Sequence, residues 1–392
     1  MTTNATARPT APPTALPSGL AGVVVATTAL GDVRGDEGFY HYRQYSAVDL
    51  ARSCTLEEVW HLLVRGHLPD ASELEAFHAE LADARALPGA TAEALDAVAT
   101  AAAGEPMTAL RTAICAAGGL LGLRPLWDLD EQERERDAGR IAALVPVLVA
   151  GAWRRSRGLA PLAPRPDLGH AANHLWLVTG EEPGERAVRA LERYLCLTVD
   201  HGFNASTFTA RVVASTGADA AACVVAALGA LSGPLHGGAP SRALDALDAI
   251  GTPANARPWA DAQLAAGGRI MGFGHAVYRG PDPRSELLRE TAQELAGPLV
   301  GLAVAAEHAI DASLAAHRPG RVLRANVEFY AGVVMHECGL PRELFSPSFA
   351  VSRVVGWTAQ VLEQARERKI IRPSAAYVGP PPPQPVPPLA AR

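Results

Sequence analysis

Apolar residues recur along most of the chain every three to four positions, the spacing that places them on one face of an α-helix. The segment TLEEVWHLLVRG (55–66) has a threonine cap, acids in the first turn, an apolar stripe through Leu56, Val59, Leu62 and Leu63, and a glycine stop. Gly and Pro separate further segments with this pattern. The sequence therefore predicts a nearly all-α chain with additional helices over 71–87, 91–104, 107–123, 138–157, 169–180, 184–200, 217–232, 240–250, 283–296, 327–338 and 347–368.

Strand-like alternation is scarce, and only FYHYRQY (39–45) indicates a short hairpin arm. No sequence period characteristic of repeat proteins is present, which argues against a solenoid. The Thr/Ala/Pro-rich lead (1–17) and the Pro-rich tail (380–392) are low in complexity, so both ends are expected to be disordered.

Two joins that contain glycine and proline, GPLHGG (233–238) and CGLPRE (338–343), are candidate hinges between domains. They predict a large helical domain whose first part covers 18–237 and whose C-terminal part covers 341–379. A smaller helical domain is then inserted between the two parts, over 238–340.

The composition is that of a globular protein, with 48% apolar and 19% charged residues and a net charge of −6. No basic run stands out, which argues against nucleic-acid or anionic-membrane partners. Lys369 is the only lysine, so a cationic group in a binding site is expected to be a guanidinium. The five cysteines are scattered without a CxxC pair, which favours a reducing compartment and no zinc site. No long uninterrupted apolar run suggests a membrane span.

His236 lies at the tip of the 233–238 hinge, shortly before a helix that begins at Pro240. The positive end of a helix dipole disfavours imidazolium there, and a neutral ring can donate a hydrogen bond that polarises a carbonyl group. From this segment alone, an ordinary surface-loop histidine is an equally good interpretation.

A second glycine-rich segment, GFGHAVYRGPDPR (272–284), places His275 where the backbone can approach a ligand closely. Asp282 is typical of an N-cap, and Arg284 then falls in the first helical turn, beside free N–H groups that suit a carboxylate. Arg279 is expected in an exposed loop that suits a phosphate. The alternative is that this is simply a well-capped helix start.

In RANVEFYAG (324–332), Asn326 is expected to cap a helix with Glu328 in its first turn. An acid at that position is common in helices. If Glu328 instead faces a site together with His236, it becomes a candidate general base.

Arg353 falls within an apolar helix, where an unpaired guanidinium is costly and needs an anion from the protein or from a substrate. Arg372 precedes a proline near the end of the structured chain and is unremarkable by itself.

A dense cluster of hydrogen-bonding side chains occupies VDHGFNASTFTARVVAST (199–216), which we interpret as a break between helices. Motifs for hydrolases, P-loop NTPases, zincins and Rossmann dehydrogenases (GxSxG, Walker A, HExxH and a strand-led GxGxxG) are absent. The cluster contains His201, Asn204, Ser206, Thr207 and Thr209.

Two loop histidines, one acid and several arginines fit the enolisation of a thioester beside a dicarboxylate. At this point the sequence resembles the citrate synthase family, over about residues 18–379. SGPLHGGA, GFGHAVYRGPDPR and ANVEFYAG are similar to its three catalytic segments in order and spacing. DHGFNASTFTARVVAST, SRVVGWTAQVLEQ and IIRP are similar to its oxaloacetate-binding and C-terminal segments. GLAGVVVATTALGDVRGDEGFYHYRQY and HLWLVTGEEP resemble the bacterial type.

The resemblance implies a cytoplasmic all-α homodimer whose two domains close over oxaloacetate and acetyl-CoA, with CoA entering as substrate and no resident cofactor or metal. It implies that His236 donates to the thioester carbonyl, that Glu328 removes the methyl proton, and that His275 protonates the oxaloacetate carbonyl. The implied oxaloacetate ligands are His201, Asn204, Arg284 and Arg353, with Arg372 supplied by the other subunit. The implied CoA-binding residues are Gly272, Gly274 and Arg279.

Three positions depart from the family pattern. Glu328 replaces the usual aspartate and is one methylene longer, Gly202 stands where an acid usually follows the histidine, and Gln44 replaces a usual glycine. A misplaced base costs about a hundredfold in rate. Two alternatives to a citrate synthase stay open: a 2-methylcitrate synthase that uses propionyl-CoA, and a paralogue that binds CoA or a dicarboxylate with weak or no catalysis.

Overall fold

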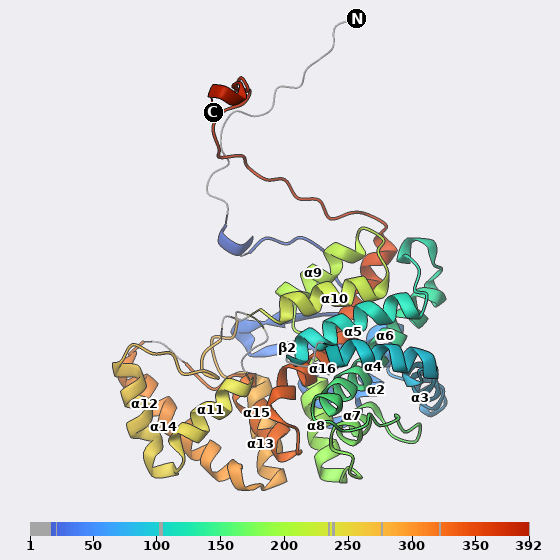
Figure 1. Cartoon of the computed structure of the whole chain (residues 1–392). Helices are drawn as coiled ribbons and strands as arrows, with labels where there is room; N and C mark the ends of the chain where they lie inside the picture. The colour runs from blue at the N-terminus through green and yellow to red at the C-terminus, as the bar shows by residue number, and fades with distance from the viewer. Residues whose placement is uncertain are drawn as a thin grey trace, which may run out of the picture.

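The computed structural model describes residues 17–391 except 21, 102–104, 234–235, 237–239, 276 and 321–322. The described chain is mostly helical (Figure 1), as the hydrophobic pattern predicts. Its helices are α1 (Ala47–Ser53), α2 (Leu56–Arg65), α3 (Ala71–Arg85), α4 (Gly89–Ala101), α5 (Pro106–Leu120), α6 (Glu131–Ser156), α7 (His170–Thr179), α8 (Glu185–Thr198), α9 (Ala205–Ala214), α10 (Ala220–Leu231), α11 (Pro240–Ile250), α12 (Ala256–Ala265), α13 (Pro283–Leu295), α14 (Pro298–His317), α15 (Val327–Glu337) and α16 (Phe345–Glu367).

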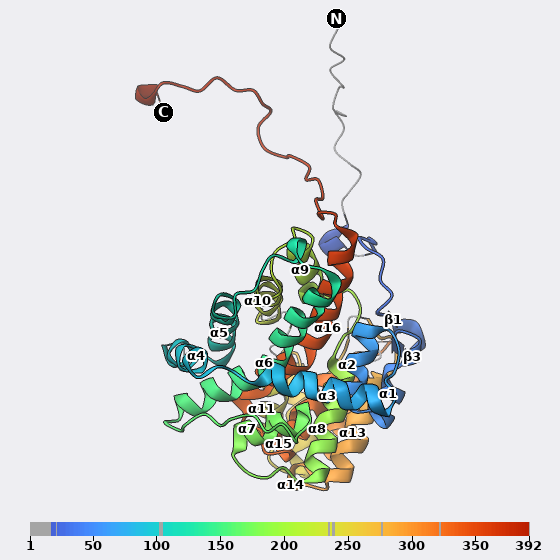
Figure 2. The same cartoon turned by 90° about the vertical axis from the view of Figure 1, so that its right-hand side faces the viewer.

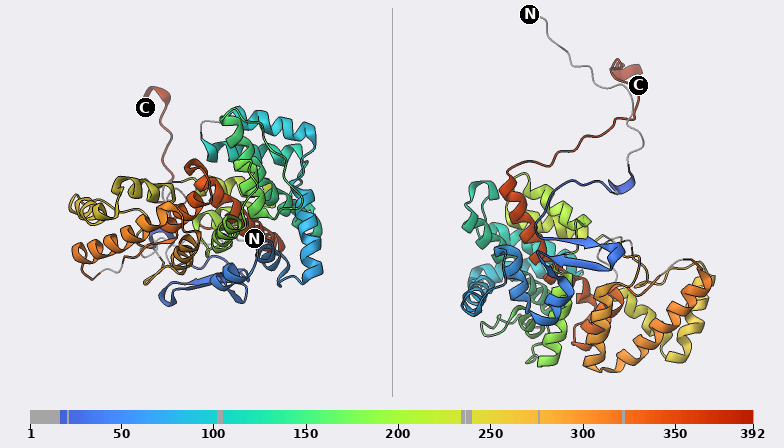
Figure 3. Two further views of the ribbon diagram at one scale, coloured as in Figure 1. Left: turned by 90° about the horizontal axis from the view of Figure 1, so that it is seen from below. Right: turned by 180° about the vertical axis from the view of Figure 1, so that it is seen from behind.

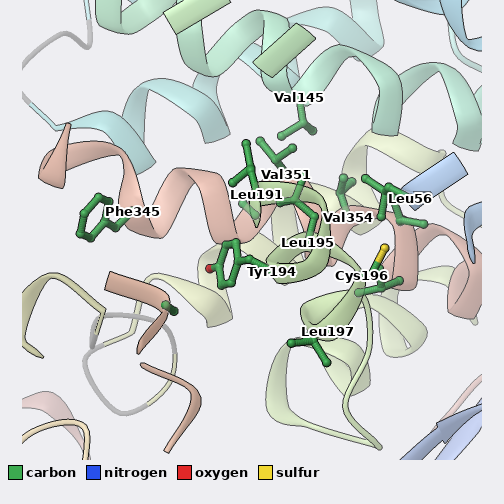
Figure 4. Close-up of a cluster of buried hydrophobic side chains, with 14 of the residues drawn as sticks. Leu56, Val145, Leu191, Tyr194, Leu195, Cys196, Leu197, Phe345, Val351 and Val354 are labelled. Atoms are coloured by element: carbon green, nitrogen blue, oxygen red, sulfur yellow. The ribbon is translucent and has the colours of Figure 1, made fainter. Parts of the chain in front are cut away.

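Helix α16 runs through the middle of the largest group of helices and packs against α6, α8, α9 and α10 (Figure 2). It is buried on nearly all sides because its sequence is apolar around most of its circumference. Val351 and Val354 join Leu191 and Leu195 of α8 in the buried cluster of Figure 4. Each such side chain contributes about 1.5–3 kcal/mol through burial.

Gly356 allows α16 to lie against the end of α8. A Cβ atom there would overlap the carbonyl oxygen of Val199, so only glycine permits this close approach. The contact sets Arg353, one turn earlier, beside the last residues of α8. The Arg353 Nε–H donates to the Thr198 carbonyl oxygen at 2.7 Å.

A small antiparallel sheet precedes the helices, in the order β1 (Gly31–Arg34), β2 (Phe39–Tyr42) and β3 (Tyr45–Ser46). It contains the hairpin arm that the alternating pattern over 39–45 predicts. Tyr40 and Tyr42 of β2 are buried, and their hydroxyls donate to the carbonyl oxygens of Leu197 and Cys196, both at 3.0 Å. The sheet is thereby fastened to the end of α8, immediately before His201.

Helices α11 to α15 gather on one side of the molecule (Figure 1), and the strands lie between them and the remaining helices in the right-hand view of Figure 3. The division into domains at 237/238 and 340/341 stays a prediction. Within this group, α14 is long and apolar enough to cross a membrane by length and composition alone. It packs against α11, α12 and α15 with Val300, Ala303 and Ile310 buried, as core helices of globular proteins also do.

The interpretation of 199–216 as a break between helices is wrong for most of its length, because Ala205–Ala214 forms α9. The Asn204 side chain accepts a hydrogen bond from the Thr207 backbone N–H and caps this helix. Three further helices, α1, α12 and α14, were not predicted from the hydrophobic pattern. In α14, alanines are spread around the helix and leave no clean apolar stripe.

The lead 1–17 lies, except for Pro17, outside the described residues. The tail leaves the end of α16 as an extended segment (Figures 1 and 3), and its described side chains over 380–390 are exposed.

Candidate active site

Most of the predicted site residues meet at one cavity of about 630 Å³. They arrive from separate places in the chain: the end of α8, the N-terminus of α9, two loops, and helices α13, α15 and α16. The predicted residues that line the cavity are His201, Asn204, His236, Gly274, His275, Arg284, Glu328 and Arg353.

A larger cavity of about 770 Å³ lies among α2, α3 and α6. It has an apolar floor and a charged rim, on which Arg65 already pairs with Glu80 and Glu135, each at 2.8 Å. Since none of the predicted catalytic groups faces it, we regard the smaller cavity as the site.

His236 occupies a turn in which its backbone N–H donates to the Gly233 carbonyl oxygen at 2.9 Å. Its Nε2 lies 2.8 Å from Ser206 Oγ, and the Trp357 indole N–H donates to the same oxygen at 3.1 Å. Because Trp357 takes one lone pair, the Ser206 hydroxyl proton is free for His236 Nε2 or for Asn204 Oδ1, which is 2.8 Å away. If the Ser206 hydroxyl donates its hydrogen bond to Nε2, the proton of the neutral His236 ring lies on Nδ1, which is then free to donate.

Burial, together with the positive charge of Arg353, lowers the pKa of His236 to about 4. The neutral ring expected from the sequence is therefore present, but desolvation is its main cause. Helix α11 begins at Pro240, as predicted.

The 272–282 loop is held against the segment before α15. Gly274 N–H donates to the Arg324 carbonyl oxygen at 2.8 Å, and the Asn326 side chain donates to the Gly274 carbonyl oxygen at 2.9 Å. Gly272 and Gly274 adopt φ values of 82° and 87°, a left-handed conformation that favours glycine. These contacts fix the position of His275.

Both ring nitrogens of His275 face donors. Nδ1 accepts from the backbone N–H groups of Val277 and Tyr278 at 2.9 and 3.0 Å, so the proton of the neutral ring belongs on Nε2. Nε2 in turn lies 3.1 Å from Nη2 of Arg284, which is also a donor. A shared acceptor, such as a carbonyl or carboxylate oxygen, would satisfy both. Burial, with the charge of Arg284, lowers the pKa of His275 to about 4.

Arg284 differs in one respect from expectation. Its guanidinium is already engaged by Asp282, with Nε to Oδ1 at 2.9 Å and Nη2 to Oδ2 at 2.8 Å, and both side chains are buried. Asp282 also accepts from the Val327 N–H at 3.0 Å and so joins the N-termini of α13 and α15. Arg284 is thus a preorganised donor whose charge is partly compensated by Asp282, a pairing that the sequence did not indicate, and its role as a carboxylate receptor stays a prediction.

Glu328 lies in the first turn of α15, as predicted, and its backbone N–H is capped by Asn326 at 3.0 Å. Its carboxylate makes no hydrogen bond or ion pair with any residue in the described part of the chain. Burial raises the pKa of Glu328 to about 7, although Arg284 opposes the shift. A carboxylate with this pKa is suited to act as a general base near neutral pH.

Arg353 is 2% exposed, and its guanidinium lies over the Phe349 ring at 4.6 Å from the centroid. Among the described residues, no carboxylate lies within ion-pair distance of it. Burial lowers the pKa of Arg353, and Asp200 partly offsets the effect. Of the two anion sources that the sequence left open, a substrate anion is the one that this geometry favours.

His201 completes the floor, with Nε2 2.8 Å from the Tyr278 hydroxyl. Burial, together with Arg284 and Arg353, holds the pKa of His201 well below its usual range. The sequence analysis did not assign Tyr278, Ser206 or Trp357 to the site. Only their proximity to predicted motifs could have suggested them.

Three predicted residues do not line the cavity in the single chain. Arg279 is exposed and lies 3.6 Å from Asp36 in the turn between β1 and β2. Gly272 packs against Phe329, and a Cβ atom at position 272 would lie only 3.1 Å from the Phe329 side chain. Arg372 follows α16 in an exposed segment.

One group with metal-ligand chemistry lies elsewhere. His61, His67 and Glu73 bring three ligand atoms within 4.8 Å of one another. His67 Nε2 is already bonded to Glu73 at 3.0 Å, and His61 Nδ1 faces the His67 carbonyl oxygen at 3.0 Å. The group contributes nothing to the cavity.

Comparison with known proteins gives one consistent result. Residues 19–374 match the sequence family described as citrate synthase, C-terminal domain. Citrate synthase 2 of Bacillus subtilis is 40% identical over 370 residues, which cover 92% of this chain and 95% of that protein. The 2-methylcitrate synthase of Mycobacterium tuberculosis is 38% identical over 378 residues, which cover 96% of this chain and 94% of that protein.

Solved structures agree. The citrate synthase of Pyrobaculum aerophilum superposes with a TM-score of 0.83 at 38% identity, covering 95% of each chain. The citrate synthase of Thermoplasma acidophilum, in a ternary complex with carboxymethyl coenzyme A and oxaloacetate, gives a TM-score of 0.84 at 27% identity, covering 95% of this chain and 98% of that one.

Proposed function

Because the chain belongs to the citrate synthase family of acyltransferases, we propose that it condenses acetyl-CoA with oxaloacetate and water to give citrate and CoA. The observation that carries this proposal is the convergence of His236, His275 and Glu328 on one cavity beside Arg353, a buried cation with no carboxylate within ion-pair distance among the described residues.

In the proposed reaction, Glu328 takes a proton from the thioester methyl group while His236 donates a hydrogen bond to the thioester carbonyl. The resulting enol carbon attacks the keto carbon of oxaloacetate, and a carbon–carbon bond forms. His275 Nε2 gives its proton to the keto oxygen, which becomes the hydroxyl of citryl-CoA. Water then cleaves the thioester, and citrate and CoA leave.

The oxaloacetate carboxylates are assigned to Arg353 and Arg284, with His201 and Asn204 orienting the substrate. Arg353 supports this assignment because it is desolvated and unpaired, so an incoming carboxylate meets little competition. The second carboxylate is assigned to a position between Arg284 and His275. Arg284 Nη2 and His275 Nε2 lie 3.1 Å apart, and since both are donors they need an acceptor between them.

CoA is assigned to the loop of Gly272 and Gly274 and to Arg279, whose exposed guanidinium is accessible to phosphates although it lies 3.6 Å from Asp36. We further propose a homodimer in which Arg372 of one subunit completes the oxaloacetate site of the other. The inserted small domain (238–340) would close over the substrates.

The five free thiols, four of them buried, support a cytoplasmic enzyme that supplies the tricarboxylic acid cycle.

A second candidate is 2-methylcitrate synthesis from propionyl-CoA, which is favoured by the 38% identity to a 2-methylcitrate synthase. Oxaloacetate-dependent release of CoA, measured side by side with acetyl-CoA and propionyl-CoA, separates the two by their kcat/KM values. A preference for acetyl-CoA is the expected result. Release with neither substrate, despite a rise in Tm with oxaloacetate, would refute the enzyme and leave the binding paralogue.

A further inference from the structure

Tyr194 lies in the penultimate turn of α8, with 1% of its surface exposed. Its ring sits at the edge of the buried apolar cluster, and the hydroxyl oxygen is turned away from Leu195 (Figure 4). Tyr194 lines the same cavity as Glu328. The residue therefore presents a polar tip at the floor of the proposed active site, although no motif in the sequence pointed to it.

The Tyr194 hydroxyl makes no hydrogen bond to any described residue. The other buried tyrosines do make one: Tyr40 and Tyr42 donate to backbone carbonyl oxygens, Tyr330 donates to Glu307, and Tyr278 bonds to His201. Buried tyrosine hydroxyls usually find a partner. Tyr194 is therefore a donor that awaits an acceptor from the cavity.

Glu328 is an acceptor without a partner, because its carboxylate makes no hydrogen bond or ion pair in the described chain. Helices α8 and α15, which carry the two residues, pack against each other. The two residues line the same cavity. Burial raises the pKa of Tyr194, and the Glu328 charge adds to this effect against the opposing charge of Arg353.

We propose that Tyr194 is a positioning residue for the base, whose phenol donates a hydrogen bond to the Glu328 carboxylate when the site is occupied. The inference rests on the proposed function of Glu328. A glutamate has one more rotatable bond than the usual aspartate, so more orientations must be restrained for its carboxylate to reach a methyl proton. A hydrogen bond to one carboxylate oxygen restrains the side chain and leaves the other oxygen free for the proton.

Other charged and titratable groups surround Glu328, and none replaces this donor. Arg284 and Asp282 face it from the α13 side, and their charges act on its pKa in opposite directions. Arg353 lies on α16, and His236 and His275 line the cavity from loops. In the described chain none of these groups is hydrogen-bonded to the carboxylate. The N–H groups of His236 and His275 are assigned to the substrates in the proposed reaction, so Tyr194 is the neutral donor left for Glu328.

The test replaces the phenol by a ring of the same shape, in Tyr194→Phe. A hydrogen bond to an ionised carboxylate favours the charged form, so its loss should move the acid limb of kcat upward by about one pH unit. On the acid side of the wild-type limb we expect kcat to fall roughly tenfold, with the KM for oxaloacetate unchanged.

The matched control is Tyr330→Phe. It removes the same atom from another buried tyrosine, whose hydroxyl donates to Glu307 outside the cavity. This variant should lose stability and keep the acid limb of the wild-type protein. It separates the proposed hydrogen bond from a general effect of losing a buried hydroxyl.

Two outcomes would overturn the assignment. If Tyr194→Phe raises the KM for oxaloacetate and leaves the acid limb in place, the phenol binds the substrate carboxylate. If neither quantity changes, Tyr194 only fills space. A carboxyl infrared titration of wild type and Tyr194→Phe, with Glu328→Gln identifying the band, measures the Glu328 pKa without turnover. Because this titration needs no turnover, it tests the inference even if the protein releases no CoA. It is run with and without oxaloacetate, and a Glu328 pKa that is the same in wild type and Tyr194→Phe under both conditions would refute the inference.

Discussion

Replacing Glu328 by glutamine should stabilise the folded protein above pH 7 while it abolishes catalysis. A carboxyl group in water has a pKa near 4.5, and burial raises that of Glu328 to about 7. Between these two pH values the unfolded chain gives up a proton that the folded chain keeps. Stability is therefore lost as the pH rises through this window, and the loss is complete above pH 7.

The magnitude follows from the width of that window. Each pH unit corresponds to 1.36 kcal/mol, so ionising Glu328 in the folded protein costs about 3 kcal/mol at pH 8. Glu328→Gln copies the shape of the protonated carboxyl group and avoids this cost. Below pH 4.5 both states are protonated in the wild type, and the variant should gain nothing.

Urea titrations of both proteins at pH 5 and pH 8 measure the difference in the free energy of unfolding. Glu286→Gln is the matched control, because Glu286 lies in the first turn of α13 but is exposed. It corrects for any loss of favourable interaction with the helix dipole, worth about 0.3–1 kcal/mol. An equal gain at both pH values, or no gain at pH 8, would show that Glu328 is not held in a desolvated, proton-binding state.

The catalytic assignments give three further expectations. The kcat/KM for acetyl-CoA should rise tenfold per pH unit up to an acid limb near pH 7, set by Glu328, and a limb near its ordinary value would contradict the burial argument. Arg353→Gln should raise the KM for oxaloacetate by at least about thirtyfold, since a desolvated charged contact is lost, and isothermal titration with oxaloacetate checks it. Ser206→Ala should lower kcat by roughly tenfold to a hundredfold, because the partner of His236 Nε2 is gone. The Tm shift with oxaloacetate should persist in Ser206→Ala, and its loss would mean that the whole pocket has collapsed.

Local sequence signals were sufficient where the responsible atoms are neighbours in the chain. Thr55 caps α2 as predicted, with Glu58 of its first turn completing a capping box, and Asn326 and Asp282 cap the helices that they were expected to cap. The loop glycines around His275 adopt the left-handed conformation that suits a close backbone approach. Each of these features is decided within a few residues, so a pattern can reveal it.

Long-range packing decided what the sequence could not show. Tyr194 and Glu328 are far apart in the chain, and only the contact between α8 and α15 makes them partners in one cavity. The pairing of Arg284 with Asp282 was hidden for another reason. Asp282 satisfied the expectation of an N-cap, and the pattern gave no sign that its carboxylate also engages the guanidinium two residues on.

Protonation states were the hardest property to predict, because they depend on depth of burial rather than on residue spacing. The same desolvation that lowers the pKa of His236 and His275 to about 4 raises that of Glu328 to about 7. Neutral imidazoles keep an N–H to donate, and a carboxylate of higher pKa binds a proton more tightly. Burial at a single cavity therefore prepares the two donors and the base together. In this site, the helix termini that the sequence reveals orient the groups, and burial sets their charge.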